Sequence, residues 1–585
     1  MKKVLISGYY GFGNTGDEAI LSAIISSLKL EIPNIDITVS SARPEETEHR
    51  YSVKAISRSV REVRRTLKRT DLFISGGGGL LQDVTSLKSL AYYCGLLILA
   101  RIERVPVMIF GQGIGPLKRR ISRMLTRLAV SGCNAIAVRD EGSKRVLEEI
   151  GVRRESIVTA DPAFLLKPVK TSRFDDTERP VVGFALRAWQ GIDFASIARA
   201  ADAIGERLGG TTVFIPFHQG RDHSVAEQIT QRMKRSAVVV DEVDLPAEVL
   251  GVIGELDVLV GMRLHSTIFA AMQSVPFVPI SYDPKVTEFA MAVGTMEPVS
   301  SVNIDADMLV SRVENILGLS SSLDGGLSYP IEDMRLKARQ NAVFAKQLLK
   351  ERRVLGIRFD ALEMDEAADS IERCIAEGRP HLVVTLNAEM MVMANSDAAF
   401  KSVLEKADLL IPDSIGITWA GKLRARVPGI EMIDELAKRA AGKGYSLYMV
   451  GADHGIAEKA AAKLRQKYPG LRIAGAHSGY FTKAQEAELV AEIQAIKPDI
   501  LLLGLGMGKQ EKWIAEHLHT LGVPACLGVG GSFDVIAGNV NRAPVWVRQA
   551  GLEWLYRFAQ RPTRLKRLLA LPKFVYLVIR ERGLM

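Results

Sequence analysis

The sequence is poor in cysteine and lacks a long apolar run. Its 585 residues include four cysteines and no CxxC pair, which excludes a disulfide framework and a cysteine-based zinc site. Charged side chains interrupt the most apolar windows, residues 91–110 and 568–579. Neither window supplies the roughly 20 uninterrupted apolar residues of a membrane span. The apolar run at residues 4–6 is too short for a signal peptide, so we expect a cytoplasmic protein.

The net charge is modest at +9, and the basic excess lies near the C-terminus. Residues 542–585 contain ten basic and two acidic residues, interleaved with aromatic residues and leucine. This pattern is typical of helices that lie on an anionic membrane surface. A solvated basic helix packed on its own domain would show the same pattern. Because no DNA- or RNA-binding motif accompanies the charge, we expect no nucleic-acid partner.

The composition is that of a multidomain α/β protein, with 47% apolar residues, 24% charged residues and 50 glycines. Strand-length apolar runs alternate with helix-length amphipathic stretches, which predicts parallel sheets. The predicted parts are Rossmann-like lobes at about residues 1–170 and 180–330, a returning helix at 331–352, a second α/β domain at 353–541 and a basic helical appendage at 542–585. The predicted strands are residues 4–7, 35–40, 71–75, 105–110, 135–139, 181–186, 211–216, 258–260, 277–280, 382–386, 408–412, 446–451, 499–504 and 525–530.

Three glycine-rich turns follow predicted strands of the first half. The turn at residues 11–16 has the GxGxxG spacing, which lets backbone N–H groups approach a phosphate at a helix N-terminus. A dinucleotide site would also need an acid after the second strand, where this chain has Ser40 and Ser41. An NAD site is therefore disfavoured. The turns at residues 76–79 and 111–115 also suit a close approach of ligand.

Arg263 and His265 follow the predicted strand at residues 258–260. In an extended turn, side chains two residues apart point the same way. A guanidinium that suits phosphate or carboxylate would then lie beside an imidazole that titrates near neutrality. Arg187, His218 and Lys285 also follow predicted strands, so we expect these side chains to converge on one crevice between the lobes.

Residues 1–350 resemble the CsaB-like polysaccharide pyruvyl transferases. The motifs are GNTGDEA at residues 13–19, GGGG at 76–79, FALR ending at Arg187, RLH at 263–265 and YDPK ending at Lys285. The resemblance implies a GT-B-like fold and transfer of a pyruvate ketal from phosphoenolpyruvate to a sugar. This chemistry needs a general acid and cations for the departing phosphate. We therefore predict His265 as the acid/base and a phosphoenolpyruvate site formed by Arg187, Arg263, Lys285, Asn14 and His218.

Polar groups also end the predicted strands of the second half. Thr385 and Asn387 close one strand, and Asp413 closes the next, where it serves either as a helix N-cap or in catalysis. A glycine turn at residues 504–511 leads into a helix and suits a diphosphate beside Lys509 and Gln510. We expect these groups at the ligand-binding edge of a parallel sheet.

Residues 354–585 resemble the WecG/TagA/CpsF glycosyltransferases. The motifs are TLN at residues 385–387, PDSIG at 412–416, RVPG at 426–429, GKQEKW at 508–513, GVGGSFDVIAG at 528–538, RAPVW at 542–546 and LEWLYR at 552–557. The resemblance implies an inverting, metal-free transfer of N-acetylmannosamine or its uronic acid from UDP to undecaprenyl-diphosphate-linked N-acetylglucosamine. Ser414 and Gly508 depart from the family pattern, where glycine and proline are usual.

The resemblance also implies roles for individual residues. Asp413 becomes the base, Thr385 and Asn387 position the sugar or acceptor, and Lys509 and Gln510 lie near the nucleotide. The basic C-terminal part docks on the membrane and completes the site. No metal-binding DxD motif is apparent, and the arginines that would replace a metal are Arg426, Arg542, Arg557, Arg561 and Arg564.

Together these patterns predict a bifunctional enzyme of secondary cell-wall polymer synthesis, attached peripherally to the cytoplasmic face of the membrane. Its substrates would be UDP-N-acetylmannosamine, phosphoenolpyruvate and undecaprenyl-diphosphate-linked N-acetylglucosamine, with no cofactor and no metal. One alternative uses UDP-N-acetylmannosaminuronic acid and pyruvylates another sugar. Another is a membrane-surface scaffold with one inactive half. The sequence leaves a homo-oligomer open.

Overall fold

The structure is a computed structural model that describes residues 2–84, 86–241, 243, 245–322, 329–423, 425–549, 552–560 and 570–581. The chain divides into two compact units, residues 1–348 and 349–585. The first unit contains two lobes with a parallel sheet each, and the second contains one parallel sheet and a two-stranded hairpin. The predicted fold class, a pair of Rossmann-like lobes followed by a separate Rossmann-like domain, is confirmed.

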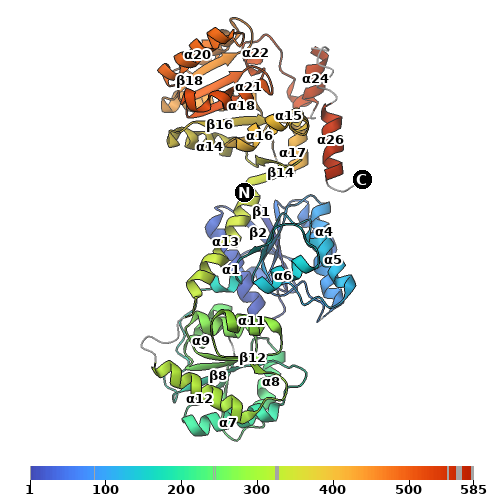
Figure 1. The fold of residues 1–585 in the computed structure, drawn as a ribbon, viewed down its shortest axis with the longest axis vertical. Helices are drawn as coiled ribbons and strands as arrows, with labels where there is room; N and C mark the ends of the chain where they lie inside the picture. Colours follow the sequence, from blue (N-terminus) through green and yellow to red (C-terminus); the bar gives the residue numbers. More distant parts are fainter. Residues whose placement is uncertain are drawn as a thin grey trace. The chain divides into compact units, whose positions relative to one another are not determined.

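The first lobe is built on a seven-stranded sheet of order β3-β2-β1-β4-β5-β6-β7. Strands β1, β4 and β5 are almost wholly buried, which is why they read as continuous apolar runs. Helices α4 and α5 lie on one side of the sheet, and α1 lies on the other (Figure 1). The elements are β1 (Lys3–Ser7), α1 (Thr15–Glu31), β2 (Asp36–Ser41), α2 (Pro44–Tyr51), β3 (Lys54–Ser57), α3 (Val60–Leu67), β4 (Leu72–Gly76), α4 (Leu87–Ile102), β5 (Val107–Gln112), α5 (Arg120–Val130), β6 (Ala135–Val138), α6 (Glu141–Glu149), β7 (Ile157–Val158) and the 3₁₀ turn η1 (Pro162–Leu165).

The second lobe repeats the plan with a six-stranded sheet of order β10-β9-β8-β11-β12-β13. Its core packs α7 and α12 against the inner strands. The elements are β8 (Val181–Ala185), α7 (Phe194–Leu208), β9 (Thr211–Phe214), α8 (Arg221–Thr230), β10 (Val238–Val239), α9 (Pro246–Gly254), β11 (Val258–Gly261), α10 (Leu264–Met272), β12 (Phe277–Ser281), α11 (Pro284–Ala292), β13 (Val299–Ser300) and α12 (Ala306–Ser322).

Helix α13 (Ile331–Lys350) returns the chain to the first lobe. Asn341 hydrogen-bonds to Thr159 at 3.1 Å, and Lys346 pairs with Glu31 of α1 at 3.0 Å. The predicted end of this helix at residue 352 is wrong, because β14 (Glu351–Val354) begins directly after Lys350 and pairs antiparallel with β15 (Ile357–Asp360).

The second unit has a parallel sheet of order β17-β16-β21-β20-β18-β19. Helices cover both faces, because two separate apolar clusters form on either side of the strands. The elements are α14 (Met364–Glu377), β16 (His381–Leu386), α15 (Ala388–Ala394), α16 (Ala398–Lys406), β17 (Leu409–Pro412), α17 (Ile415–Gly421), α18 (Gly429–Lys443), β18 (Ser446–Gly451), α19 (Ile456–Lys467), β19 (Arg472–His477), α20 (Lys483–Ile496), β20 (Ile500–Gly504), α21 (Lys509–Leu521), β21 (Ala525–Gly528), α22 (Ser532–Ile536), α23 (Val545–Gln549), α24 (Glu553–Gln560) and α26 (Ala570–Glu581).

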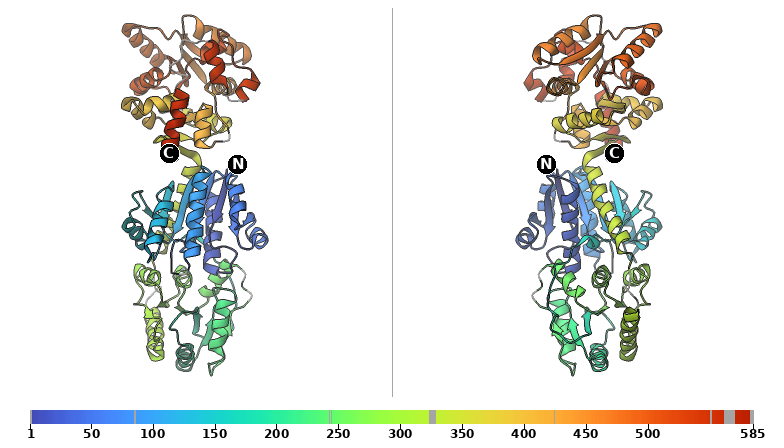
Figure 2. Two further views of the ribbon diagram at one scale, coloured as in Figure 1. Left: turned by 90° about the vertical axis from the view of Figure 1, so that its right-hand side faces the viewer. Right: turned by 90° about the vertical axis from the view of Figure 1, so that its left-hand side faces the viewer.

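The last described helix, α26, packs on the sheet domain instead of standing apart from it. Phe574 and Val578 are fully buried in the core, and α26 lies beside α15 and α17 (Figures 1 and 2). The Glu581 carboxylate accepts hydrogen bonds from the backbone N–H groups of Leu355 and Gly356 at 2.9 and 3.2 Å. Among the helices that the structure describes, none has the length and apolarity required to cross a membrane.

Candidate active sites

The strand order of each lobe in the first unit reverses at one point, between β1 and β4 in one lobe and between β8 and β11 in the other. Ligands of open α/β sheets bind outside the carboxyl ends of the strands at such points. The loop after β1 reaches the second lobe there: Asn14 forms a β-bridge with His218, and the Thr15 N–H donates to the Phe217 carbonyl at 2.8 Å. The structure therefore brings the predicted residues Asn14 and His218 together through their backbones.

The side chains of these two residues bond within their own loops. The Asn14 carboxamide caps α1, because its Oδ1 accepts from the Gly16 N–H at 3.1 Å. The His218 Nδ1 lies 2.8 Å from the Gln219 carbonyl oxygen. Both residues border the contact between the lobes, where a bound anion would meet the N-terminus of α1.

Arg263 and His265 do not share an extended turn, so that expectation was wrong. Helix α10 begins at Leu264, directly after Arg263, which puts His265 in its first turn. Residues two apart on a helix point in different directions. Strand β11 ends at Gly261, and Arg263 takes the extended conformation of an N-cap with φ −82° and ψ 133°, so the helix begins at the next residue.

The Arg263 guanidinium is held by a buried carboxylate that the sequence reading missed. Its Nε and Nη2 atoms contact the two oxygens of Asp222 on α8 at 2.5 and 2.6 Å. The Asp222 side chain is 1% exposed, and a two-point pair of this kind fixes the plane of the guanidinium. Within the described residues, Nη1 of Arg263 has no hydrogen-bond partner, so it remains available to an anion.

His265 lies where the two lobes meet, and its buried Nε2 atom makes no hydrogen bond within the described residues. Its Nε2 atom lies 3.5 Å from Oδ2 of Asp161, the residue that caps η1. Its Nδ1 atom would lie 2.1 Å from a Cβ at Gly16, so only glycine at that position leaves room for the ring. Burial alone would raise the pKa of Asp161, but His265 and Arg139 outweigh burial and hold it below the usual value. An ionised Asp161 therefore faces the imidazole.

Arg187 and Lys285 meet around one aromatic ring. Arg187 follows β8, and its Nη1 donates to the Tyr282 hydroxyl at 3.0 Å. Its guanidinium lies 5.0 and 4.8 Å from the ring centroids of Trp189 and Tyr282, and Lys285 Nζ lies 5.8 Å from that of Tyr282. The Nε of Arg187 is buried without a partner in the described structure. Lys285 also lies 3.4 Å from Asp283. The two predicted cations are therefore neighbours, as expected.

In the second unit, the predicted N-cap alternative for Asp413 is wrong. Ser414 caps α17 through its hydroxyl, while Asp413 Oδ1 accepts from the Gly429 N–H at 3.0 Å. Gly429 is the first residue of α18. The aspartate follows β17 directly, so its carboxylate lies at the carboxyl edge of the sheet. Ser414, a departure from the family pattern, also accepts from the Ala388 N–H at 3.1 Å.

Thr385 and Asn387 lie on the neighbouring strand end. The Thr385 hydroxyl donates to the Gly528 carbonyl of β21 at 2.9 Å, and its side chain would contact a Cβ at Gly429 at 3.4 Å. Asn387 caps α15 by accepting from the Met390 N–H at 3.0 Å. Thr385, Asn387 and Asp413 thus meet at the carboxyl ends of β16 and β17, the edge predicted from the sequence.

Gln510 faces the protein interior, whereas the sequence predicted a side chain near the nucleotide. It is 1% exposed, donates to Glu511 at 2.6 Å and accepts from the Gly530 N–H at 3.0 Å. Burial raises the pKa of Glu511, which also accepts from the Gly508 N–H at 2.7 Å. These bonds join the glycine turns after β20 and β21. Lys509, in contrast, is exposed.

The predicted arginines of the second unit are ion-paired where their side chains are described. Arg426 contacts Glu553 of α24 at 2.8 Å. Arg542 pairs with Glu431 of α18, which Arg548 also contacts at 3.1 Å. These pairs tie the basic C-terminal segment to the sheet domain. Arg561 and Arg564 lie outside the described residues, and so does the side chain of Arg557.

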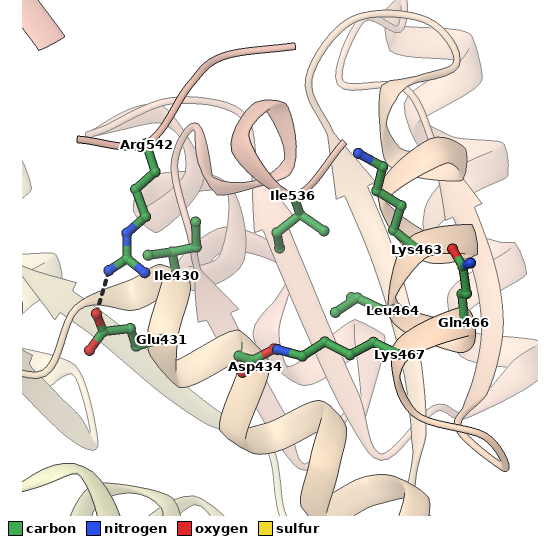
Figure 3. Close-up of a pocket in the computed structure, with 9 residues that line it drawn as sticks. All are labelled: Ile430, Glu431, Asp434, Lys463, Leu464, Gln466, Lys467, Ile536 and Arg542. Carbon is green, nitrogen blue, oxygen red and sulfur yellow. Dashed lines mark hydrogen bonds and ion pairs between the residues drawn. The ribbon is translucent and has the colours of Figure 1, made fainter. Parts of the chain in front are cut away.

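A pocket of about 460 Å³ lies beside α18, within the usual size range of ligand sites. Figure 3 shows the ion pair of Arg542 and Glu431 at one end and Lys467 reaching Asp434 at the other. Its lining residues come from α18, α19 and α22 and the segment after them: Ile430, Glu431, Asp434, Lys463, Leu464, Gln466, Lys467, Ile536 and Arg542. The sequence reading had identified only Arg542 of this group.

Two family models match the chain. Residues 352–584 match the glycosyl transferase WecG/TagA/CpsF family, and residues 14–284 match polysaccharide pyruvyl transferase. A protein of Bacillus subtilis (strain 168), named N-acetylglucosaminyldiphosphoundecaprenol N-acetyl-beta-D-mannosaminyltransferase, is 34% identical over 206 residues, which are 34% of this chain and 79% of that protein. The chain belongs to the WecG/TagA/CpsF glycosyltransferase family and carries a polysaccharide pyruvyl transferase domain. Both predicted resemblances are confirmed.

Further relatives agree with the glycosyltransferase domain. A protein of the same name from Staphylococcus aureus (strain MW2) is 32% identical over 236 residues, 39% of this chain and 92% of its own. Among solved structures, UDP-GlcNAc 2-epimerase from Neisseria meningitidis, bound to UDP-GlcNAc, is 14% identical with a TM-score of 0.42, and covers 60% of this chain and 100% of its own. That likeness is too low to add to the fold described above.

Three carboxylates of the pyruvyl transferase domain escaped the sequence reading. Asp161 follows the two-residue strand β7, and Asp222 lies on α8, 41 positions from its partner Arg263. Asp17 stands within the quoted GNTGDEA motif. The sequence signal for Asp161 is an acidic residue that follows a strand and precedes a proline. The other two give no sequence signal beyond an acid near a helix start. In the described part of the chain, no cluster of three or more His, Cys, Asp or Glu side chains is arranged to hold a metal.

Proposed function

We propose that the chain is a bifunctional enzyme of cell-wall polymer synthesis. The glycosyltransferase domain transfers N-acetylmannosamine from its UDP conjugate to N-acetylglucosamine carried on undecaprenyl diphosphate, with inversion to a β linkage. The pyruvyl transferase domain then places a pyruvate ketal from phosphoenolpyruvate on the mannosamine. The WecG/TagA/CpsF match and the printed names of the two relatives support the first reaction. The pyruvyl transferase match and the cations Arg187, Arg263 and Lys285 support the second.

The observation that carries the pyruvyl transfer is the presence of three cations and His265 after the strands of the second lobe. Arg187 and Lys285 lie at Tyr282, and Arg263 is held by Asp222. Phosphoenolpyruvate has two anionic groups, a phosphate and a carboxylate. Arg263, Lys285 and Arg187 are three cationic side chains, which is enough to bind both groups. His265 Nε2 lies 3.5 Å from an ionised Asp161, and we assign the imidazole as a group that transfers protons to or from substrate. Protonation of the methylene and departure of phosphate are then assisted at one place.

In the glycosyltransferase domain, we assign Asp413 as the base that removes the proton of the acceptor hydroxyl. Its Oδ1 is fixed by the Gly429 N–H, and Thr385 and Asn387 flank it at the same sheet edge. Inverting transfer needs one carboxylate and positive groups for the leaving UDP. Arg542 and Lys463, which line the adjacent pocket, are candidates for the diphosphate. We propose that neither reaction uses a metal or a cofactor.

Peripheral attachment to a membrane follows from the acceptor lipid. The C-terminal segment exposes Trp546 at 68%, Trp554 at 40% and Tyr576 at 50% of their surfaces, near the exposed Lys573. Aromatic residues interleaved with basic ones suit the interface of an anionic bilayer. We therefore propose that this surface holds the chain on the cytoplasmic leaflet.

The decisive experiment incubates the purified chain with UDP-N-acetylmannosamine, phosphoenolpyruvate and a short prenyl-diphosphate N-acetylglucosamine, and analyses the product by mass spectrometry. We expect one added N-acetylhexosamine and, only with phosphoenolpyruvate present, one added pyruvate ketal. A parallel arm offers UDP-N-acetylmannosaminuronic acid, and preferential use of that donor would reject N-acetylmannosamine as the substrate. A chain that adds neither group under any arm would reject the proposal and leave a scaffold role.

A further inference from the structure

Asp17 is a buried carboxyl of the pyruvyl transferase domain that the proposed roles leave unused. It lies in the first turn of α1 and is 8% exposed. Its Oδ1 would lie 2.4 Å from a Cβ at Gly78, a glycine with φ of +49° in the loop after β4. Only glycine at that position leaves room for the carboxyl, which packs against the loop after β4. Within the described residues, no donor hydrogen-bonds to the Asp17 carboxyl.

The neighbouring acid shows the contrast. Glu18 is equally buried, but its carboxylate accepts from the Gly11 N–H at 2.8 Å and from the Tyr51 hydroxyl at 2.7 Å. Those bonds tie the glycine loop to the helix, so Glu18 has a structural role. Asp17, in contrast, has no such structural partner.

The groups around Asp17 are those that would bind the substrate. The charged and titratable groups that act on it or respond to it are His265 on α10, Lys285 on α11, Arg263 before α10, Glu18 on its own helix, and the buried Tyr10 and Tyr93. A phosphoenolpyruvate bound by Arg263 and Lys285 would therefore contact two of the cations that act on the Asp17 carboxyl.

Asp17 and Asp161, the two carboxyls that interact electrostatically with His265, have opposite protonation tendencies. Burial raises the pKa of Asp17 to about 6, although His265 and the cations oppose the shift. The pKa of Asp161 is instead held low by His265 and Arg139 against the effect of burial. Such divergence is typical of a pair in which one carboxyl donates a proton and the other stays ionised. A bound trianion would raise the pKa of Asp17 further.

The proton balance of ketal formation calls for a second proton-transferring group. The methylene carbon of phosphoenolpyruvate gains one proton and becomes a methyl group, two C–O bonds form to the acceptor, and the C–O bond to phosphate breaks. The two acceptor hydroxyls lose two protons. One is needed for the methyl group and the other leaves on phosphate. A donor at the methylene and an acceptor at the first hydroxyl must act in the same turnover.

We propose that Asp17 is the general acid that protonates the methylene carbon, while His265, oriented by Asp161, accepts the proton of the attacking hydroxyl. His265 then passes that proton to the departing phosphate, and the second hydroxyl returns a proton to Asp17 as it closes the ketal. Both residues are thereby restored. This assignment rests on the proposed pyruvyl transfer.

The test compares Asp17→Asn with the matched control Glu18→Gln, both in the full chain. We expect Asp17→Asn to lower kcat for pyruvyl transfer by about 100-fold or more and to leave the KM for phosphoenolpyruvate within about threefold. Glu18→Gln, which keeps the loop bonds, should retain kcat within about threefold. The wild-type kcat/KM should fall above a pH of about 6, where Asp17 loses its proton, and this limb should be missing from the residual activity of Asp17→Asn.

The outcomes separate the two claims. If the wild type transfers pyruvate and Asp17→Asn keeps kcat within tenfold with the same basic limb, the role of Asp17 is rejected and the function stands. If the wild type transfers no pyruvate, the function itself is rejected. Stabilisation by phosphoenolpyruvate in a melting experiment verifies that the variant retains its site. If phosphoenolpyruvate does not stabilise the variant, the pH profile of wild-type kcat/KM is the deciding measurement. A wild-type profile that does not fall above a pH of about 6 would reject the assignment.

Discussion

His265 Nε2 lies 3.5 Å from the carboxylate of Asp161, which is 3% exposed and also contacts Arg139 at 3.2 Å. The two residues come from different lobes, so this contact joins the lobes. Asp161 is itself anchored, since Oδ1 accepts from the Ala163 N–H at 3.0 Å. Nε2 of the imidazole therefore lies toward Asp161, and Nδ1 lies against Gly16.

Asp161→Asn should impair catalysis more than binding. The amide keeps the shape of the side chain but removes the negative charge that lies 3.5 Å from the imidazole. We expect kcat for pyruvyl transfer to fall by about 100-fold or more, with the KM for phosphoenolpyruvate nearly unchanged. Steady-state kinetics on a preformed acceptor would measure this split. Equal losses in kcat and in phosphoenolpyruvate affinity would instead indicate a general disturbance of the site.

Asp17→Asn should stabilise the first unit at neutral pH. The pKa of Asp17 is raised from 3.8 to about 6 in the folded chain, so the folded state binds more protons than the unfolded state between these values. Its contribution to stability is therefore present at low pH and is lost as pH rises through about 6, which costs at most about 3 kcal/mol.

Melting curves of wild type and Asp17→Asn at pH 4.5 and pH 7.5 would check the sign. The first unit is identified by the transition that phosphoenolpyruvate shifts. The variant should melt higher at pH 7.5, and its advantage should shrink at pH 4.5. A variant that is less stable at pH 7.5 would show that the Asp17 carboxylate has a stabilising partner. A site residue that reduces stability is a common cost of function.

Asp222→Asn should weaken both stability and phosphoenolpyruvate binding. It removes the charge from a pair whose members are 13% and 1% exposed, and breaking one partner of a buried pair costs about 3–5 kcal/mol. Arg263 then loses its fixed plane, so the KM for phosphoenolpyruvate should rise. Urea unfolding and steady-state kinetics measure the two effects. Asp241→Asn, at an exposed pair with His223, is the control and should change neither.

The sequence predicted the sheet cores and the strand ends well, because both depend on local pattern. Thr385, Asp413 and Arg187 all lie at the carboxyl ends of parallel strands, where the alternation of elements places them. The short edge strands were missed. β7 and β10 contain two residues each, which is too few to show an alternation of apolar and polar residues. In β19 this alternation is weak, because much of the strand is solvent-exposed.

Contacts made across long separations could not be read from the sequence. The partner of Arg263 lies 41 positions away on another helix. Asp17 and Glu18 are adjacent acids at a helix start, and only the fold directs one to the glycine loop and the other to the crevice. Gln510 belongs to a motif that suggests a ligand contact, yet its amide bonds internally at both ends.

Single substitutions should separate the two activities. Asp413→Asn leaves the bond from the Gly429 N–H possible but removes the base, so sugar transfer should fall by about 100-fold or more while pyruvylation of a preformed mannosaminyl acceptor continues. His265→Ala should do the reverse. Each variant thus serves as the folding control of the other. Loss of both activities in either variant would contradict the division of labour between the units.

Membrane attachment should depend on the exposed tryptophans of the C-terminal segment. Trp546→Ala combined with Trp554→Ala removes two large apolar side chains that are 68% and 40% exposed, so the loss of buried apolar area should weaken binding to phosphatidylglycerol vesicles by about tenfold or more. The control is Met124→Ala, a side chain 64% exposed in the pyruvyl transferase domain, which should cosediment as the wild type does. Added salt should weaken the wild type further, because anionic lipid attracts the basic residues through a screened field. If the double variant cosediments with vesicles as fully as the control, the aromatic surface is not the attachment site.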